Sequence, residues 1–293
     1  NQASRTTCVK PEGTASCILG TSSGIHPHHA KRYIRRVQAN KMENIYQHFK
    51  KENPRACEES VWSANDSDDV VSFCIEVPDG AKLKNKVGAL DLLGCVKSTQ
   101  QNWVMTGKTE SLCAQPYLEH NVSNTINIKP EEWEEVRAFI YKNRRYFCGV
   151  SLLPVSGDKD YPQAPFTTVY LPSEIVSHYG DGAMFVSGLI EVALNLWEDN
   201  LWVACDSLLG FGKKVKGNGK KTWAVRCQRF ADKYMGGDIK RLTYCMKDVY
   251  NWKEWVDIKG SYTPVEYTLC IEEQDNTKPE QELACAGGVC DII

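Results

Sequence analysis

The chain has 293 residues, of which 42% are hydrophobic, and a formal net charge of -2. This length and composition are typical of a soluble globular protein with one large domain or two smaller ones. The near-neutral charge excludes a protein that attracts nucleic acid or membranes through its overall charge, although basic clusters occur locally. The longest apolar segment, residues 182–197, is interrupted by Ser187 and Glu191 and is too short to cross a bilayer, so we expect a core helix there.

The chain contains 13 cysteines, an odd number with irregular spacing, and the sequence shows no secretory signal. We therefore expect reduced thiols in the cytoplasm rather than a framework of disulfides. No C-x-x-C pair is present, so we expect neither a zinc ribbon nor a zinc finger. The sequence starts at Asn1 and runs at once into strand-like residues, and we expect it to be the C-terminal part of a longer protein.

The first predicted elements lie within residues 1–41. Residues 5–9 predict a short strand, residues 11–13 a turn, and the segment from Thr14 a short helix. Residues 26–41, HPHHAKRYIRRVQANK, predict a basic helix because their apolar residues recur at helical spacing. Those apolar residues are Ala30, Tyr33, Ile34 and Val37.

The later predicted elements alternate between strands and helices. Dense β-branched residues predict strands at residues 68–78 and 121–128. Residues 129–145 predict a helix, with a proline in the first turn, acidic residues early and basic residues late. Residues 147–155 form an apolar run typical of a buried parallel strand, and residues 223–255 predict mostly helix. Strands that alternate with helices favour an α/β architecture.

A glycine turn between the first strand and the short helix is the first candidate site. Residues 10–16, KPEGTAS, place backbone N–H groups at the start of a helix, and the hydroxyls of Thr14 and Ser16 add donors. Such a group of donors favours an anion, and phosphate is its natural ligand. The pattern is not the G-x-x-x-x-G-K-[ST] of a P-loop, so plain turn chemistry remains the alternative. Glu12 disfavours an anion unless its side chain points away.

A stretch rich in histidine and arginine follows this loop. His26, His28 and His29 are close in sequence, but their spacing does not put all three on one face of a helix, so we expect no metal. The arginines further along fit either a phosphate or RNA ligand, or a solvated helix face with one inward arginine. They are Arg32, Arg35 and Arg36. Residues 212–221, GKKVKGNGKK, form a second basic segment, which most simply is a solvated loop.

The chain ends in two cysteines on a polar tether. Residues 271–282, IEEQDNTKPEQE, are too poor in apolar residues to bury a core, so we expect a flexible arm that carries Cys285 and Cys290. Two glycines between these cysteines permit a small disulfide ring with little strain. Thiols on such an arm can exchange with a disulfide elsewhere, over a reach of about 25 Å. A redox shuttle is therefore favoured over a structural disulfide or a metal site.

Five motifs, in order along the chain, carry a resemblance to a known family. They are TTCVKPEGTASCILGTSSGIHPHHAKRYIRRV, HNVSNTI, GVSLLPVSGDKDYPQAPF, LTYCMKDVYNWKEW and the terminal ACAGGVC. Together they resemble the adenosylcobalamin-dependent (class II) ribonucleotide reductases, and within that family most closely the monomeric ribonucleoside-triphosphate reductases. Because the motifs extend from residue 6 to the end, the resemblance covers nearly the whole chain.

The resemblance implies a fold and a substrate site. The family folds as a ten-stranded α/β barrel made of two half-barrels of parallel strands. Residues 1–270 would then form the C-terminal part of that barrel, and residues 271–293 a flexible redox tail. The family's loop that matches residues 10–16 holds the phosphates of the substrate nucleotide, and this role would pass to Gly13, Thr14, Ala15 and Ser16. The family more usually has Ser where Glu12 stands, so Glu12 is carried over only as a neighbour.

The resemblance also implies a reaction. In this family homolysis of the cobalt–carbon bond of adenosylcobalamin leads to a thiyl radical, which abstracts the ribose 3′-hydrogen. The 2′-hydroxyl is then lost, and two cysteines supply the reducing electrons. Cys285 and Cys290 would re-reduce the resulting disulfide and would themselves be reduced by thioredoxin or a similar dithiol. The radical cysteine of the family lies in an N-P-C-G-E-like loop, and neither Cys8 nor Cys17 matches that pattern.

We therefore expect the radical cysteine to lie outside this chain. The chain would supply substrate-phosphate binding, part of the barrel wall and the thiol shuttle. It would need the N-terminal portion of the barrel as a partner and would be inactive alone. Its other partners would be a ribonucleotide and a dithiol reductant in the cytoplasm, with no membrane, no nucleic acid and no metal site.

Two other interpretations remain open. One is a redox-responsive module that binds nucleic acid through residues 32–36 or 213–221, with the cysteine pair as a switch. The other is a separately encoded subunit of a split reductase, which keeps the chemistry but changes what the natural protein is.

Overall fold

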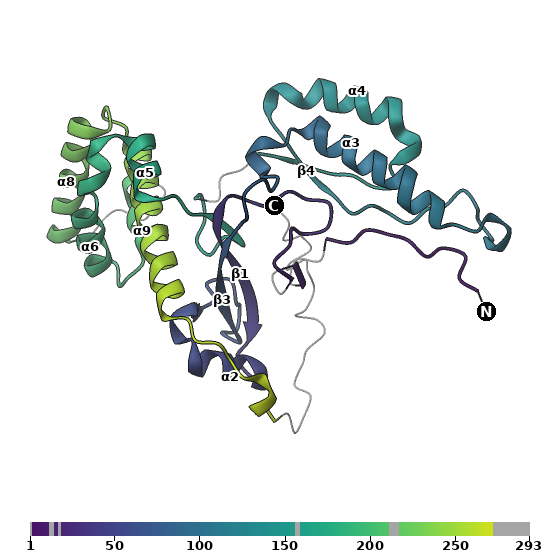
Figure 1. The fold of residues 1–293 in the computed structure, drawn as a ribbon. Coiled ribbons are helices and arrows are strands. Elements are labelled where there is room, and N and C mark those ends of the chain that lie inside the picture. Colours follow the sequence, from purple (N-terminus) through teal and green to yellow (C-terminus); the bar gives the residue numbers. More distant parts are fainter. Residues whose placement is uncertain (1, 12–14, 17–18, 156–158, 211–216, 272–293) are drawn as a thin grey trace. The chain divides into compact units, whose positions relative to one another are not determined.

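The computed structural model divides the chain into two compact units (Figure 1). The residues that it describes are 2–11, 15–16, 19–155, 159–210 and 217–271. Within these ranges, the first unit draws on Asn1–Lys31 and Ile75–Gly157, and the second on Arg32–Cys74 and Asp158–Asp275. Helices and strands are mixed, as the predicted α/β class requires in its coarser sense. None of the helices in the described ranges combines the length and the hydrophobicity needed to cross a bilayer.

The first unit contains a two-stranded parallel sheet with two helices packed against it. Its elements are α3 (Ala89–Thr99), β4 (Thr125–Ile128), α4 (Trp133–Asn143) and β5 (Ser151–Pro154). The strands pair in register from Thr125 opposite Ser151 to Ile128 opposite Pro154. Residues of β4, α3 and α4 form one buried cluster, and Figure 1 shows both helices beside β4. The predicted helix at residues 129–145 and the predicted parallel strand at residues 147–155 are thus confirmed in kind.

The strand β5 is less buried than the sequence predicts. In β5, Leu152 and Leu153 are only half-buried, and Ser151 and Pro154 are exposed. The strand pairs with β4 on one side, and no other described strand joins this sheet. A parallel strand becomes fully buried only when further strands and helices cover it.

The second unit is built around a four-stranded sheet in the order β2-β3-β1-β6. The strands are β1 (Arg32–Asn40), β2 (Cys57–Glu59), β3 (Asp68–Glu76) and β6 (Phe166–Thr168). Both β1 with β6 and β2 with β3 are antiparallel. The predicted strand at residues 68–78 is confirmed by β3. Most of the described strand residues therefore lie in an antiparallel sheet. The sequence pattern favours parallel strands and does not predict this sheet.

The predicted basic helix at residues 26–41 is wrong, because residues 32–40 form the strand β1. Tyr33, Ile34 and Val37 fit a helical spacing, but aromatic and β-branched residues also favour strands. Tyr33 and Ile34 pair with Thr168 and Thr167 of β6. Because β1 pairs with a strand on each side, it is a strand and not a helix. This pairing involves residues that are far away in the sequence.

The three arginines of β1 form neither a solvated face nor an open anion site, which corrects both interpretations of them. Arg32, Arg35 and Arg36 are 8%, 6% and 7% exposed. Arg32 forms an ion pair with Glu174, and Arg36 donates two hydrogen bonds of 2.9 Å to the carboxylate of Glu254. Arg35 donates to the carbonyl oxygen of Pro165 and lies over the ring of Phe166. Buried guanidinium groups need such partners.

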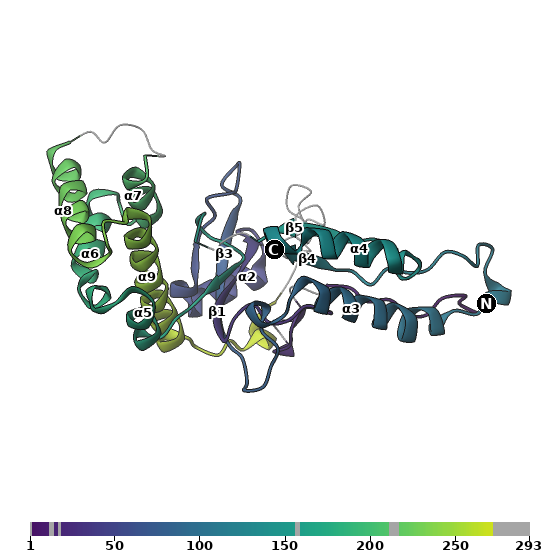
Figure 2. The ribbon, with the colours of Figure 1, turned by 90° about the horizontal axis from the view of Figure 1, so that it is seen from above.

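Helices make up the rest of the second unit. They are α2 (Asn44–Glu52), α5 (Pro172–Tyr179), α6 (Ser187–Leu196), α7 (Leu201–Leu208), α8 (Asn218–Tyr234) and α9 (Ile239–Ser261). Helices α5 to α9 share a buried cluster that includes Ile190, Trp223 and Leu242, and Figure 2 shows them gathered together. The side chains of Asn200 and Asp238 cap α7 and α9 by accepting backbone N–H groups. The core helix predicted within residues 182–197 and the helices predicted within residues 223–255 are confirmed.

Candidate functional site

The candidate anion loop follows an extended segment, which pairs with the residues just before β4. Val9 forms an isolated parallel bridge with Val122, and the Ser123 N–H donates to the Val9 carbonyl at 2.9 Å. Residues 5–9 do not form a full strand; Arg5 and Val9 make single bridges. The parallel pairing nevertheless brings Lys10 level with the residues that lead into β4. The loop over residues 10–24 therefore begins next to the sheet of the first unit.

The two ends of this loop are fixed to each other. The hydroxyl of Ser23 donates to the carbonyl oxygen of Pro11. Gly24 has φ +54, and a Cβ atom there would overlap the carbonyl oxygen of Lys10. Only glycine combines this left-handed conformation with such a close approach of two backbone segments. We call Lys10, Pro11, Ser23 and Gly24 the neck of the loop.

His26 ties the neck to β4. Its Nδ1 lies 2.9 Å from the Ser23 carbonyl oxygen, and its Nε2 lies 2.9 Å from the Thr125 backbone nitrogen. Because the Thr125 N–H is a donor, Nε2 accepts, and the proton of the neutral ring sits on Nδ1 and is donated to Ser23. Burial lowers the pKa of His26; the bond to Ser23 opposes this effect, and the charge of Lys84 adds to it. The neutral ring is therefore the form that fits this place.

The structure describes two of the four predicted phosphate-binding residues. Ala15 is half-buried and Ser16 is buried, and both are helical. The Thr21 N–H donates to the Ser16 carbonyl at 3.0 Å, which holds the far side of the loop. Gly13 and Thr14 lie outside the described residues.

The predicted tail residues Cys285 and Cys290 also lie outside the described residues, as does Cys17. The ten cysteines that the structure describes are all free thiols.

The neighbouring histidines are used differently from His26. His28 pairs through its backbone, donating to the Lys82 carbonyl at 2.9 Å and accepting from the Lys84 N–H at 2.7 Å. Burial lowers the pKa of His28. In the part of the chain that the structure describes, no three His, Cys, Asp or Glu side chains are grouped so as to hold a metal ion.

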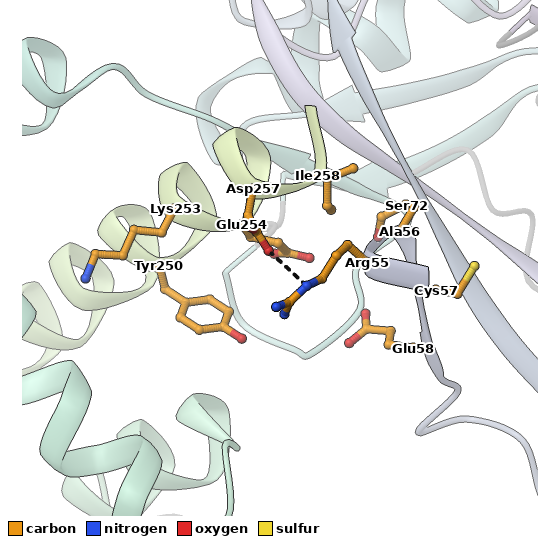
Figure 3. Close-up of a pocket in the computed structure, with 10 residues that line it drawn as sticks. All are labelled: Arg55, Ala56, Cys57, Glu58, Ser72, Tyr250, Lys253, Glu254, Asp257 and Ile258. Atoms are coloured by element: carbon orange, nitrogen blue, oxygen red, sulfur yellow. Dashed lines mark ion pairs between the residues drawn. The ribbon is translucent and has the colours of Figure 1, made fainter. Parts of the chain in front are cut away.

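A polar pocket of about 370 Å³ lies in the second unit, between β2 with its flanking turn and the helix α9 (Figure 3). Glu58 and Glu254 line it, and Arg36 lies near both, with Nε 3.7 Å from Glu58 and Nη2 2.9 Å from Glu254. Burial raises the pKa of Glu58, although the charge of Arg36 opposes the change. The dashed line in Figure 3 marks the ion pair of Arg55 with Asp257, at 3.9 Å. The acidic and basic side chains around the pocket are thus largely paired with one another. The volume of the pocket suits a small polar molecule.

A half-buried lysine, Lys159, forms a second polar cluster in this unit. The ammonium group of Lys159 donates to Asp248 at 2.7 Å, and the Tyr179 hydroxyl donates to the same carboxylate oxygen at 2.8 Å. The ammonium also lies 5.1 Å and 5.6 Å from the ring centroids of Tyr170 and Tyr244. The cluster anchors the chain at residue 159 to α5 and α9.

Sequence reasoning did not find the neck, the pocket or the lysine cluster. Each joins residues that are distant in the chain: His26 and Thr125 are 99 positions apart, and Lys159 and Asp248 are 89 apart. The only local signal was the Ser-Ser-Gly run before His26, which is typical of a turn.

Comparison with known proteins gives partial matches to one kind of enzyme. The chain is 28% identical over 159 residues to an adenosylcobalamin-dependent ribonucleoside-triphosphate reductase of Levilactobacillus brevis, covering 54% of this chain and 19% of that protein. It is 24% identical over 186 residues to the enzyme of the same name from Lactobacillus helveticus, covering 62% of this chain and 23% of that protein. The chain thus spans about a fifth of the length of these relatives.

A solved structure of a B12-dependent (class II) ribonucleotide reductase matches with a TM-score of 0.40 and 22% identity, over 56% of this chain and 21% of that one. No family model matches the chain. The two sequence relatives confirm the resemblance that the ordered motifs predict: this chain is similar to a portion of the adenosylcobalamin-dependent ribonucleoside-triphosphate reductases.

Proposed function

We propose that this chain is the C-terminal portion of an adenosylcobalamin-dependent reductase that converts ribonucleoside triphosphates to 2′-deoxyribonucleoside triphosphates for DNA synthesis. The observation that carries this is the loop at residues 10–24. Its sequence matches the family's substrate-phosphate motif, and its neck is fixed beside a parallel strand pair. In α/β sheets, loops that follow strands of a parallel set are common places for nucleotide phosphates.

Within this proposal, Gly13, Thr14, Ala15 and Ser16 hold the substrate phosphates. Backbone N–H groups and the two hydroxyls would donate to phosphate oxygens, and such bonds to a charged acceptor are stronger than those to a neutral one. The fixed neck supports this role because a loop that is already positioned loses less conformational entropy when it binds.

We further propose that residues 1–270 form part of the ten-stranded barrel. Within the described ranges β5 has one unpaired edge and is partly exposed, as a parallel strand is when its neighbouring strands come from elsewhere. The missing strands would come from the N-terminal portion of the reductase, either in the same chain or as a separately encoded subunit. Alone, this chain would then be inactive.

The tail at residues 271–293 would carry reducing equivalents in the cytoplasm. A thiolate of Cys285 or Cys290 would attack the active-site disulfide, giving a mixed disulfide and releasing one active-site thiol. The second tail thiolate would then displace the other, so that two electrons pass and the tail ends as a disulfide. Thioredoxin or a similar dithiol would reduce that disulfide.

Adenosylcobalamin would supply the radical chemistry that ordinary side chains do not start unaided. The polar pocket beside Glu58, at about 370 Å³, has the size of a small-ligand site and does not fit a corrinoid with its adenosyl group. No described residue is therefore assigned to the cofactor.

The interpretation as a nucleic-acid-binding module rested on two basic segments, and the structure argues against one of them. It relied partly on the arginines at positions 32, 35 and 36, which are buried and engaged with acidic, carbonyl and aromatic partners. Lys221 is exposed at the start of α8, and binding of an oligonucleotide at low salt would be the test of what remains.

The substrate loop can be tested by removing its hydroxyls in the complete enzyme. The double variant Thr14→Ala/Ser16→Ala should raise KM for a ribonucleoside triphosphate, because each lost charge-assisted bond is worth roughly 1.5 to 3 kcal/mol. Ser22→Ala, which removes a hydroxyl in the same loop but outside the motif, is the matched control. An unchanged KM in the double variant would mean that the loop is only a turn.

A further inference from the structure

A chain of hydrogen bonds runs from β4 into the neck of the substrate loop. The Thr125 N–H donates to Nε2 of His26, Nδ1–H of His26 donates to the Ser23 carbonyl, and the Ser23 hydroxyl donates to the Pro11 carbonyl. His26 is 9% exposed, so water has little access to replace these bonds. The place of Pro11 relative to β4 is therefore set through the imidazole ring together with the pairing of Val9 with Val122.

Histidine suits this position better than other polar residues. In its neutral form the ring has one donor and one acceptor on a rigid frame, pointing in different directions. An amide side chain carries both groups at one end of a flexible stem, and phenylalanine fills the volume without either group. Losing the ring nitrogens would leave the buried N–H of Thr125 without its partner, which is costly. The half-buried Ser23 carbonyl would keep only its bond from the His26 backbone N–H, at 3.0 Å.

We propose that His26 is a positioning residue, whose neutral imidazole fixes the neck of the loop against β4 and thereby sets where a triphosphate is held. This inference rests on the proposed function, since it takes residues 13–16 as the phosphate site. His26 itself touches neither substrate nor cofactor. Its effect reaches the phosphates through Ser23 and Pro11.

The experiment measures binding of inorganic triphosphate to the full 293-residue chain by calorimetry. His26→Phe should weaken binding roughly tenfold or more, because it removes both bonds. His26→Gln should recover part of the affinity, since its amide can replace one bond. His48→Phe is the matched control: His48 makes one backbone contact, to Glu266, in the other unit, and its loss should leave triphosphate binding unchanged. Unfolding midpoints of all variants show whether the fold is retained.

A second measurement keeps the inference testable if His26→Phe does not fold. Nitrogen NMR of the wild-type ring at neutral pH should show a single tautomer, with the proton on Nδ1 and none on Nε2. A ring protonated on Nε2 would overturn the inference, because that nitrogen would then be unable to accept from Thr125.

The outcomes separate the inference from the proposed function. If the wild-type chain does not bind triphosphate, the phosphate loop fails and His26 has nothing to position. If the wild type binds and folded His26 variants bind equally well, only the role of His26 is overturned. If affinity falls only in proportion to the unfolded fraction, His26 is purely structural, and the inference is again wrong.

Discussion

Arg36 and Glu254, which are 218 positions apart, meet in an ion pair in which Nη2 of Arg36 lies 2.9 Å from each carboxylate oxygen of Glu254. The pair joins the central strand β1 to the helix α9. The Arg36 side chain is 6% exposed and that of Glu254 is 19% exposed, so both charges are largely removed from water. Arg36 also donates to the hydroxyl of Thr167 on β6. One side chain therefore connects the sheet and the helical part of the second unit.

Breaking this pair should be strongly destabilising. Arg36→Met leaves the carboxylate of Glu254 buried without its partner, and we expect a loss of roughly 3 to 5 kcal/mol in the free energy of unfolding, measured by urea titration. The double variant Arg36→Met/Glu254→Gln should recover part of that loss. The control is Arg137→Met, which removes the exposed pair with Glu134 and should change little. A loss in Arg36→Met no larger than in the control would contradict a structural role for the pair.

The failure at β1 and the success at α4 show what local pattern can and cannot predict. In α4, acidic residues at the start and basic residues at the end agree with the helical period, so every local signal favours a helix. In β1, Ile34 and Val37 fit the helical period, but as β-branched residues they also favour a strand, and pairing with β6 decides. The partners of buried arginines are likewise set by tertiary contacts. Sequence reasoning therefore predicted elements with agreeing local signals, such as α4 and α6, but it made no prediction for α2, α3, α5 or α7 and missed the antiparallel sheet.

The same limit applies to the candidate site. The motif at residues 10–16 was visible because its glycine and hydroxyls are consecutive. The support of that motif was not visible, since it uses His26 and Thr125 from different segments. The roles of Gly13, Thr14, Ala15, Ser16, Cys285 and Cys290 stay predictions.

Gly24 provides a test of the neck. Gly24→Ala should cost more than the roughly 1 to 2 kcal/mol of a left-handed non-glycine residue, because the added Cβ also overlaps the Lys10 carbonyl. Gly20→Ala is a close control, since Gly20 has φ +62 but open space around its Cβ position. Thermal unfolding compares the two. Equal destabilisation by both variants would show that the ends of the loop are not in contact.

Stability should depend on pH through His26. Its folded-state pKa is lowered mainly by burial, whereas an unfolded histidine titrates near about 6.5. The stabilisation it provides is therefore complete above about pH 6.5 and is lost as the pH falls toward the folded-state pKa. Lys84, whose charge acts in the same direction, is the charged group that contributes to this shift.

The variant His26→Gln isolates this effect. Between about pH 5 and pH 6.5, its free energy of unfolding should fall less steeply with acid than that of the wild type. His28, whose pKa is also lowered by burial, is kept in both proteins and so contributes equally. Identical pH slopes would mean that His26 is not held in its neutral form.

The tail cysteines should be required for turnover with thioredoxin but not for turnover with a small dithiol. In the complete enzyme, Cys285→Ser or Cys290→Ser should abolish turnover driven by thioredoxin, because neither variant can form the tail disulfide. Turnover with a small dithiol, which can enter the active site directly, should be largely retained. Equal loss with both reductants would contradict a shuttle.

The central claim is tested most directly by the product of the complete protein. The coding sequence upstream of the Asn1 codon, or a separately encoded partner, should supply the missing part of the barrel with its N-P-C-G-E-like loop. Given a ribonucleoside triphosphate, adenosylcobalamin and a dithiol, the completed protein is predicted to form the 2′-deoxyribonucleoside triphosphate. No deoxynucleotide from a folded, complete protein would contradict the assignment as a ribonucleotide reductase.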